Sequence, residues 1–94
     1  MNLPLISISR LEAALYEWHL LYGSEVVDAE AGDSSITGCL ASAVDCIPED
    51  GKLVEIRYRG IHMGTFHVKS LREMPGDVAE RVSELYAAYV DTIS

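Results

Sequence analysis

Two cysteines are the residues of this sequence best suited to thiol or metal chemistry. Cys39 and Cys46 lie seven positions apart in a stretch with helical periodicity. Two helical turns would separate their Cα atoms by about 10 Å, which is beyond the reach of a disulfide bond. No C-x-x-C or H-x-x-x-H spacing is present to preorganise a tetrahedral metal site. We therefore expect two small, apolar, reduced thiols and no metal.

The three histidines are the next candidates for chemistry. His19 lies in a stretch with helical periodicity, and His62 and His67 lie five positions apart in an alternating stretch. On a regular strand this odd spacing places two side chains on opposite faces, whereas a bulge at Gly64 would bring both to one face. No spacing in the chain predicts that three metal ligands converge. A nucleophilic pair of Cys46 with His67 would depend on tertiary proximity.

Paired carboxylates occur at Glu80 with Glu84 and at Glu49 with Asp50. Such pairs are typical of a solvated surface, and no partner residue marks them as an acid–base couple. The sequence contains no phosphate-binding G-x-x-x-x-G-K-[ST], no dinucleotide-binding G-x-G-x-x-G and no nucleophile-elbow G-x-S-x-G motif. The sequence therefore predicts a protein that is not an enzyme and has no cofactor.

Length and composition indicate one small domain over residues 1–94. The chain is 49% hydrophobic and carries a formal net charge of −8. A chain this short buries little more than about 60% of its unfolded surface, and small domains often gain further burial by forming dimers. No cationic stretch precedes the short apolar run Leu3–Ile6, and no apolar run is long enough to span a bilayer. We expect a cytoplasmic protein without membrane contact.

The elements that would position these residues begin with a predicted helix at about 9–22. Ser9 and Glu12 fit a capping box, and Gly23 stands where a left-handed C-terminal cap is expected. The preceding residues 3–8 fit either a short strand or an extended arm, and Glu25–Asp28 fits either a strand or a helical turn. The helical stripe consists of Leu11, Ala14, Leu15, Trp18, Leu21 and Tyr22.

A second helix is predicted to start at Asp33, Ser34 or Ser35 and to end before Pro48. Its apolar stripe consists of Ile36, Leu40, Ala43, Val44 and Ile47. After the turn Glu49–Gly51 the periodicity becomes alternating, which predicts a β-hairpin turning at Arg59–Gly60. The simplest register pairs Tyr58 with Ile61, Ile56 with Met63 and Val54 with Thr65.

The last predicted helix follows Pro75-Gly76-Asp77 and runs to Ile93. Residues 69–74 read as a connecting turn, with Ser70 and Glu73 as a one-turn capping box. The predicted fold is therefore α+β in the order helix-helix-β-hairpin-helix, with helices packed on one face of a short antiparallel sheet. The other face would carry Leu53, Phe66 and Val68 among its charges, and more of this chain or a second chain should cover part of it.

Charge is unevenly distributed along the chain. Nine acidic residues and no basic residue lie from Glu12 to Asp50, whereas five basic residues and the single acid Glu55 lie from Gly51 to Arg72. A basic hairpin is therefore set between acidic helices. These charges fit ordinary surface pairs, or complementary surfaces of a partner protein or a symmetry mate. Contact with a nucleic-acid backbone is disfavoured because the net charge is strongly negative.

These observations favour a non-enzymatic interaction or regulatory protein that binds a protein partner and forms a homodimer. In its size, acidity and lack of catalytic signatures the chain resembles accessory regulators of bacteria and their phages. An alternative is accordingly a phage-type inhibitor that presents acidic helices to a host nucleic-acid-binding or defence protein. The least favoured alternative is a small metal-dependent enzyme using His62, His67 and a cysteine. The residues predicted to bind a partner are Arg57, Arg59, His62, Phe66, Tyr86, Tyr89, Glu25, Glu30 and Asp33.

Overall fold

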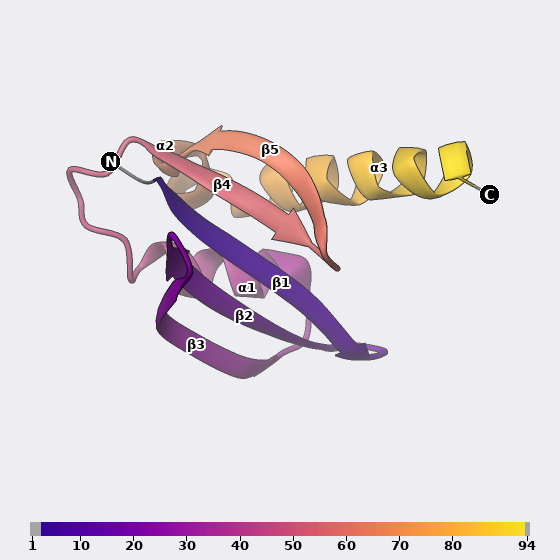
Figure 1. Cartoon of the computed structure of the whole chain (residues 1–94), viewed down its shortest axis with the longest axis horizontal. Helices are drawn as coiled ribbons and strands as arrows, with labels where there is room; N and C mark the ends of the chain where they lie inside the picture. Colours follow the sequence, from indigo (N-terminus) through magenta and orange to yellow (C-terminus); the bar gives the residue numbers. More distant parts are fainter. Residues whose placement is uncertain (1–2, 94) are drawn as a thin grey trace.

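The computed structural model describes residues 3–93 as an α+β arrangement of a five-stranded mixed sheet and helices (Figure 1). The strand order across the sheet is β3-β2-β1-β4-β5, in which β1 and β4 are parallel and all other neighbours are antiparallel. The predicted order helix-helix-hairpin-helix is therefore wrong, because three strands precede the first helix. The elements are β1 (Pro4–Glu12), β2 (Leu15–Tyr22), β3 (Glu25–Asp33), α1 (Ile36–Val44), β4 (Leu53–Tyr58), β5 (Ile61–His67), α2 (Val68–Glu73) and α3 (Pro75–Ile93).

The helix predicted at 9–22 is instead the end of β1, a tight turn and the whole of β2. Ala14 adopts a left-handed φ of 56° in this turn, and Gly23, with φ 64°, turns β2 into β3 where a helix cap was expected. Trp18 and Leu20 alternate into the core, while Leu21 faces the other side and is half-buried. Because β2 carries apolar side chains on both faces, its pattern also fits a helical stripe. The segment forms a strand because it pairs with β1 on one side and with β3 on the other.

Strand β3 carries the three acidic residues that the inhibitor alternative assigned to acidic helices. Glu25, Glu30 and Asp33 lie on this strand, which forms one edge of the sheet. Of the two readings left open for Glu25–Asp28, the strand is correct. Likewise, residues 4–8 form part of β1 and are not an extended arm.

The predicted hairpin is confirmed as β4 and β5, with a change of register. Tyr58 pairs with Ile61 as predicted, but Ile56 lies opposite Gly64 and Val54 lies opposite Phe66. The shift arises between Ile56 and Arg57, where the return strand contains one extra residue beside Gly64, whose φ is 120°. This irregularity is the bulge that the internal glycine indicated.

The bulge corrects the predicted outer face of the hairpin. Phe66 packs against the core on the helix side of the sheet, and Val68 is buried at the start of α2. The predicted outer-face placement was wrong for Phe66 because the bulge shifts the alternation by one residue, and for Val68 because β5 ends at His67 and α2 begins. Only Leu53 of the three predicted outer apolar residues lies there, and it is 37% exposed.

Helix α1 forms where the sequence predicts a helix, although it is shorter. Ser35 is the N-cap and accepts a hydrogen bond from the Gly38 N–H at 3.0 Å. The helix ends at Val44 and is followed by a tight turn, so Cys46 lies beyond it. Arg72 closes this end, because its Nη2 donates hydrogen bonds to the carbonyl oxygens of Val44, at 3.3 Å, and Ile47, at 2.7 Å.

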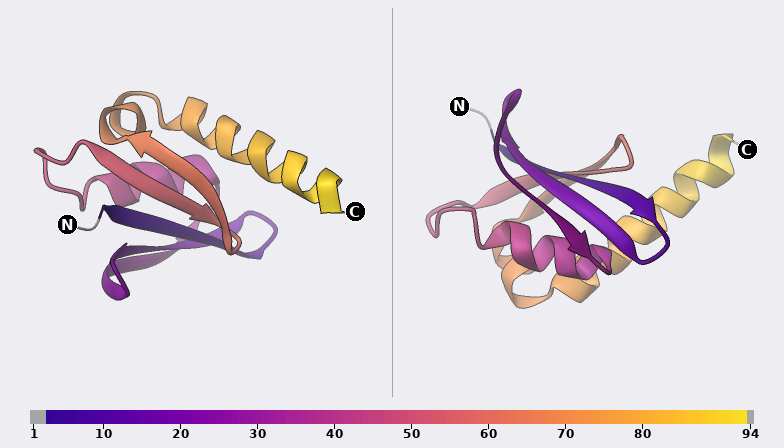
Figure 2. Two further views of the ribbon diagram at one scale, coloured as in Figure 1. Left: turned by 45° about the horizontal axis from the view of Figure 1, so that its top comes forward. Right: turned by 90° about the horizontal axis from the view of Figure 1, so that it is seen from below.

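The helices lie on one face of the sheet, and the core lies between the two layers (Figure 2). Residues 68–73, most of the predicted connecting turn, form the short helix α2, while α3 confirms the predicted last helix. Among residues 3–93, no helix is long and apolar enough to cross a membrane. The fully buried side chains with the largest volumes are Trp18, Ile6, Ile8, Leu20, Leu40, Ile56 and Leu71.

Candidate interaction surfaces

The structure distributes the predicted partner-binding residues over five places. Arg57 and His62 lie on the outer face of the sheet, and Arg59 lies in the β4–β5 turn, where it meets α3. The acidic residues lie on the β3 edge. Phe66 lies on the helix side and is no part of an exposed site. Tyr86 and Tyr89 lie on α3, one against the hairpin and the other beyond it.

The β4–β5 turn is joined to α3 by stacked side chains. The Arg59 guanidinium lies 5.1 Å from the centre of the Tyr86 ring, and the Tyr58 ring meets the same ring edge-on at 5.0 Å. Arg59 holds a left-handed φ of 53°, which is unfavourable for a side chain of this kind. Its backbone N–H donates to the carbonyl oxygen of Ile8 at 2.9 Å, so both ends of the residue are held. These contacts fix the middle of α3 against the hairpin.

Beyond this contact, α3 carries an apolar stripe that the rest of the chain covers only in part. Val82 is fully buried and Leu85 and Tyr86 are half-buried, whereas Tyr89 is 40% and Ile93 is 64% exposed. Figure 1 shows the C-terminal part of α3 running past the edge of the sheet. The predicted stripe therefore has two parts, a core part before Tyr86 and an exposed part after it.

A row of side chains crosses the outer face of the sheet from β3 to β5. The register pairs Ala29 with His19, His19 with Ser7, Ser7 with Arg57, and Arg57 with His62. On the same face, His62 Nε2 lies 3.3 Å from Glu55 Oε1.

The bulge also places His67, opposite Leu53, on this outer face, as the conditional prediction from Gly64 stated. All three histidines of the chain therefore share one face. Within the described chain, they and the other possible ligands form no cluster able to hold a metal ion.

The β3 edge forms an acidic surface. Every residue of β3 except Asp33 is exposed, including Val26 and Val27, which are about half exposed. Asp28, Glu30 and Asp33 lie close enough to the two cysteines to act on their thiols electrostatically. Charged side chains and register shifts are typical protection of an exposed edge strand against unwanted pairing, and β3 has both.

Neither cysteine is poised for nucleophilic chemistry. Burial raises the pKa of the Cys39 thiol to about 12, and the neighbouring Asp33 carboxylate adds to the shift. A hydrogen bond with Asp28 is the main cause that raises the pKa of Cys46 to about 11. Both thiols are therefore protonated at neutral pH, the opposite of what an attacking thiolate requires.

Alkylation of Cys46 by iodoacetamide at pH 8 is expected to be about tenfold slower than alkylation of an ordinary thiol. A pKa raised from 9.0 to about 11 reduces the thiolate fraction roughly a hundredfold, and the greater nucleophilicity of a more basic thiolate recovers part of this loss. Rates measured by mass spectrometry from pH 7 to 11 test this. Asp28→Asn should accelerate the reaction, with Asp50→Asn as the charge-matched control. An ordinary rate at pH 8 in the native protein would contradict the assignment.

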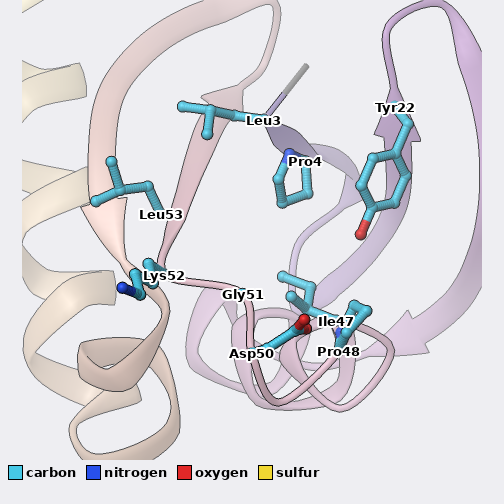
Figure 3. Close-up of a pocket in the computed structure, with 9 residues that line it drawn as sticks. All are labelled: Leu3, Pro4, Tyr22, Ile47, Pro48, Asp50, Gly51, Lys52 and Leu53. Atoms are coloured by element: carbon cyan, nitrogen blue, oxygen red, sulfur yellow. The ribbon is translucent and has the colours of Figure 1, made fainter. Parts of the chain in front are cut away.

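An apolar cleft of about 570 Å³ lies where β1 begins, β2 ends and the α1–β4 connection passes (Figure 3). No sequence motif marks this site, because its walls come from three segments that are separated in the chain. The available signals were Pro4, Pro48 and Gly51, residues of restricted or special backbone geometry within apolar stretches. The lining residues are Leu3, Pro4, Tyr22, Ile47, Pro48, Asp50, Gly51, Lys52 and Leu53.

Comparison of the chain with protein-family models, with curated proteins and with solved structures found no match in any of the three.

Proposed function

We propose that this chain is a non-enzymatic protein that acts through protein–protein contact and self-associates as a dimer through the C-terminal half of α3. One observation carries the proposal, namely that Tyr89 and Ile93 continue an otherwise buried apolar stripe into solvent. Tyrosine and large aliphatic side chains in such a position supply much of the binding free energy of protein interfaces.

A second copy of the same helix is a fitting partner for this stripe. Leu85, Tyr89 and Ile93 recur at a spacing of four, so two antiparallel copies of α3 that cross at Tyr89 would place each Leu85 beside Ile93 of the other copy. A two-fold crossing of this kind uses the same residues on both copies and closes the assembly at two. It leaves the acidic residues Glu84 and Asp91 on the solvent side of the helices.

Sedimentation equilibrium of the wild-type protein, from low to high micromolar concentration, tests self-association. We expect a concentration-dependent shift from monomer to dimer, with no species beyond the dimer. A monomer throughout this range would overturn the homodimer proposal. A ladder of larger species would overturn the two-fold arrangement, because it indicates head-to-tail contacts.

The exposed acidic edge β3 favours a second candidate, in which the protein inhibits a basic, nucleic-acid-binding partner. The edge offers a row of main-chain hydrogen-bonding groups along β3, together with carboxylates such as Glu25 and Glu30. A basic extended segment could add to it as a further strand, with the main chain giving affinity and the charges giving orientation.

Charge reversal of the edge is expected to weaken binding of an extended peptide of alternating lysine and valine at least tenfold. The double variant Glu25→Lys with Glu30→Lys changes the edge, and Glu49→Lys with Glu80→Lys makes the same change in net charge elsewhere. Asp33 is left unaltered because its carboxylate lies against Gly38 in the first turn of α1. Fluorescence anisotropy at two salt concentrations measures the affinities. Equal losses in both double variants would show non-specific attraction and remove this candidate.

A further inference from the structure

The cleft at the start of β1 has preorganised walls. Two prolines, Pro4 and Pro48, form part of the lining and have fixed backbone φ angles. The Gly51 N–H donates to the Pro48 carbonyl oxygen at 2.9 Å and closes a turn. A Cβ added at Gly51 would lie 3.0 Å from Cγ2 of Ile47 and 3.1 Å from this carbonyl oxygen, so the turn tolerates no side chain there without shifting. The cleft therefore exists before any ligand arrives.

The size and chemistry of the cleft fit a small apolar ligand. Its volume of about 570 Å³ lies within the range of small-molecule sites, roughly 300–1,000 Å³. Most of its wall is aliphatic, and Leu3 and Leu53 are 38% and 37% exposed. Apolar side chains at the mouth of a preformed hollow lower their solvent contact when a ligand enters.

The polar groups of the cleft select the charge of that ligand. In Figure 3 the Tyr22 hydroxyl and the Asp50 carboxylate lie at the hollow, whereas the Lys52 ammonium points away from it. Within residues 3–93, neither the Tyr22 hydroxyl nor the Asp50 carboxylate forms a side-chain hydrogen bond or ion pair. One carboxylate and one hydroxyl beside an apolar hollow suit a protonated amine, and the net charge of −8 attracts cations to the protein.

We infer that this cleft binds a compact apolar group that carries a single protonated amine. The amine donates hydrogen bonds to the Asp50 carboxylate and the Tyr22 hydroxyl, while the apolar body lies between Leu3, Pro4 and Leu53. The same chemistry is offered by a free aliphatic amine and by the N-terminus of a peptide that begins with large aliphatic residues. The start of β1 and the end of β2, which supply lining residues of the cleft, lie at the opposite end of the molecule from the C-terminal half of α3 (Figure 1). This site is therefore separate from the proposed self-association surface.

Titration of the ¹⁵N-labelled protein with octylamine, octanol and octanoate, followed by amide chemical shifts, tests the inference. We expect octylamine to bind about tenfold more tightly than octanol, and octanoate to bind most weakly, because only the amine gains a charge-assisted hydrogen bond. The largest shifts should fall on residues 47–53 and on the ends of β1 and β2. Shifts centred elsewhere, or equal affinity for the three probes, would overturn it.

Two matched pairs of variants distinguish the contribution of cleft residues to probe binding from the general effect of removing a charge or an exposed leucine. Asp50→Asn should abolish most of the preference for octylamine, whereas Glu49→Gln removes the same charge one residue away and should leave the preference intact. Leu53→Ser should weaken all three probes several-fold, with Leu11→Ser as the control at an exposed leucine outside the cleft. An unchanged preference in Asp50→Asn would contradict the role of the carboxylate.

A further titration, with a short peptide, identifies the source of the amine. The tripeptide amide Leu-Leu-Leu should bind in its free form and lose about tenfold in affinity when its N-terminus is acetylated. Binding of octylamine alone would support a small-molecule ligand, and preferential binding of the free tripeptide would support a polypeptide N-terminus. Binding of neither probe would overturn the inference. Because no α3 residue is altered, this result is separate from the dimerisation result.

Discussion

Tyr89→Glu is expected to convert the dimer to a monomer, raising the dimer dissociation constant roughly a hundredfold or more. In the proposed crossing, Tyr89 of each copy lies against Tyr89 of the other at the centre of the interface. The substitution removes a large apolar surface from this centre and places two like charges opposite each other. Since Tyr89 is 40% exposed in the monomer, the fold itself should lose little stability.

The control for this substitution is Ala87→Glu, which introduces the same charge on the exposed, opposite side of the same helix. Sedimentation equilibrium should show monomer for Tyr89→Glu and unaltered association for Ala87→Glu, with equal midpoints of urea unfolding extrapolated to low protein concentration. If both variants dissociate equally, net charge rather than the stripe governs association. If neither dissociates, the interface lies elsewhere.

Leu20→Ala is expected to lower the free energy of unfolding by about 2–5 kcal/mol, whereas Leu21→Ala should cost less than about 1 kcal/mol. In strand β2 the Leu20 side chain is fully buried and Leu21 is half-buried on the outer face. If residues 9–22 formed a helix, Leu21→Ala would cost more stability than Leu20→Ala, because Leu21 belongs to the apolar stripe of that helix and Leu20 does not. The pair therefore discriminates between the two structures of this segment.

Urea unfolding followed by the fluorescence of Trp18, the only tryptophan, measures both variants. Small domains have a free energy of unfolding of about 5–15 kcal/mol. The loss expected for Leu20→Ala is a large part of this total, so the variant is expected to be only marginally folded. Leu20→Ile preserves the side-chain volume and should fold, with a loss below about 1.5 kcal/mol. A larger loss for Leu21→Ala than for Leu20→Ala would contradict the strand.

Most elements from Ser35 onward could be predicted from the sequence because their signals are local. Ser35 supplies a cap, the alternation from Val54 to Tyr58 supplies a strand, and the apolar stripe of α3 extends over about four turns. Residues 9–22 could not be predicted, because β2 is apolar on both faces and its strand character depends on the partner strands on either side. Turn residues Ala13 and Ala14 also give no turn signal, since alanine favours helices.

A candidate surface could be predicted from the sequence when one continuous segment forms it, and could not when distant segments form it together. The exposed end of α3 follows from one periodic segment, and Tyr89 was identified from it. The contact of Arg59 with Tyr86 depends on where the hairpin turn meets the helix, which no spacing encodes. The cleft between Tyr22, Gly51 and Leu53 forms only when the sheet is assembled, so its lining residues share no motif or spacing in the sequence.

The parallel pairing of β1 with β4 has a consequence for how the molecule folds. The meander β1–β3 and the hairpin β4–β5 each join strands that are neighbours in sequence, so each can form by closing short loops. The contact between them joins residues fifty positions apart, from Leu5 with Glu55 to Ile8 with Tyr58. Closing so long a loop carries an entropic cost before any contact offsets it. We therefore expect the formation of this four-pair parallel seam to be a slow step of folding, later than the closure of the local turns.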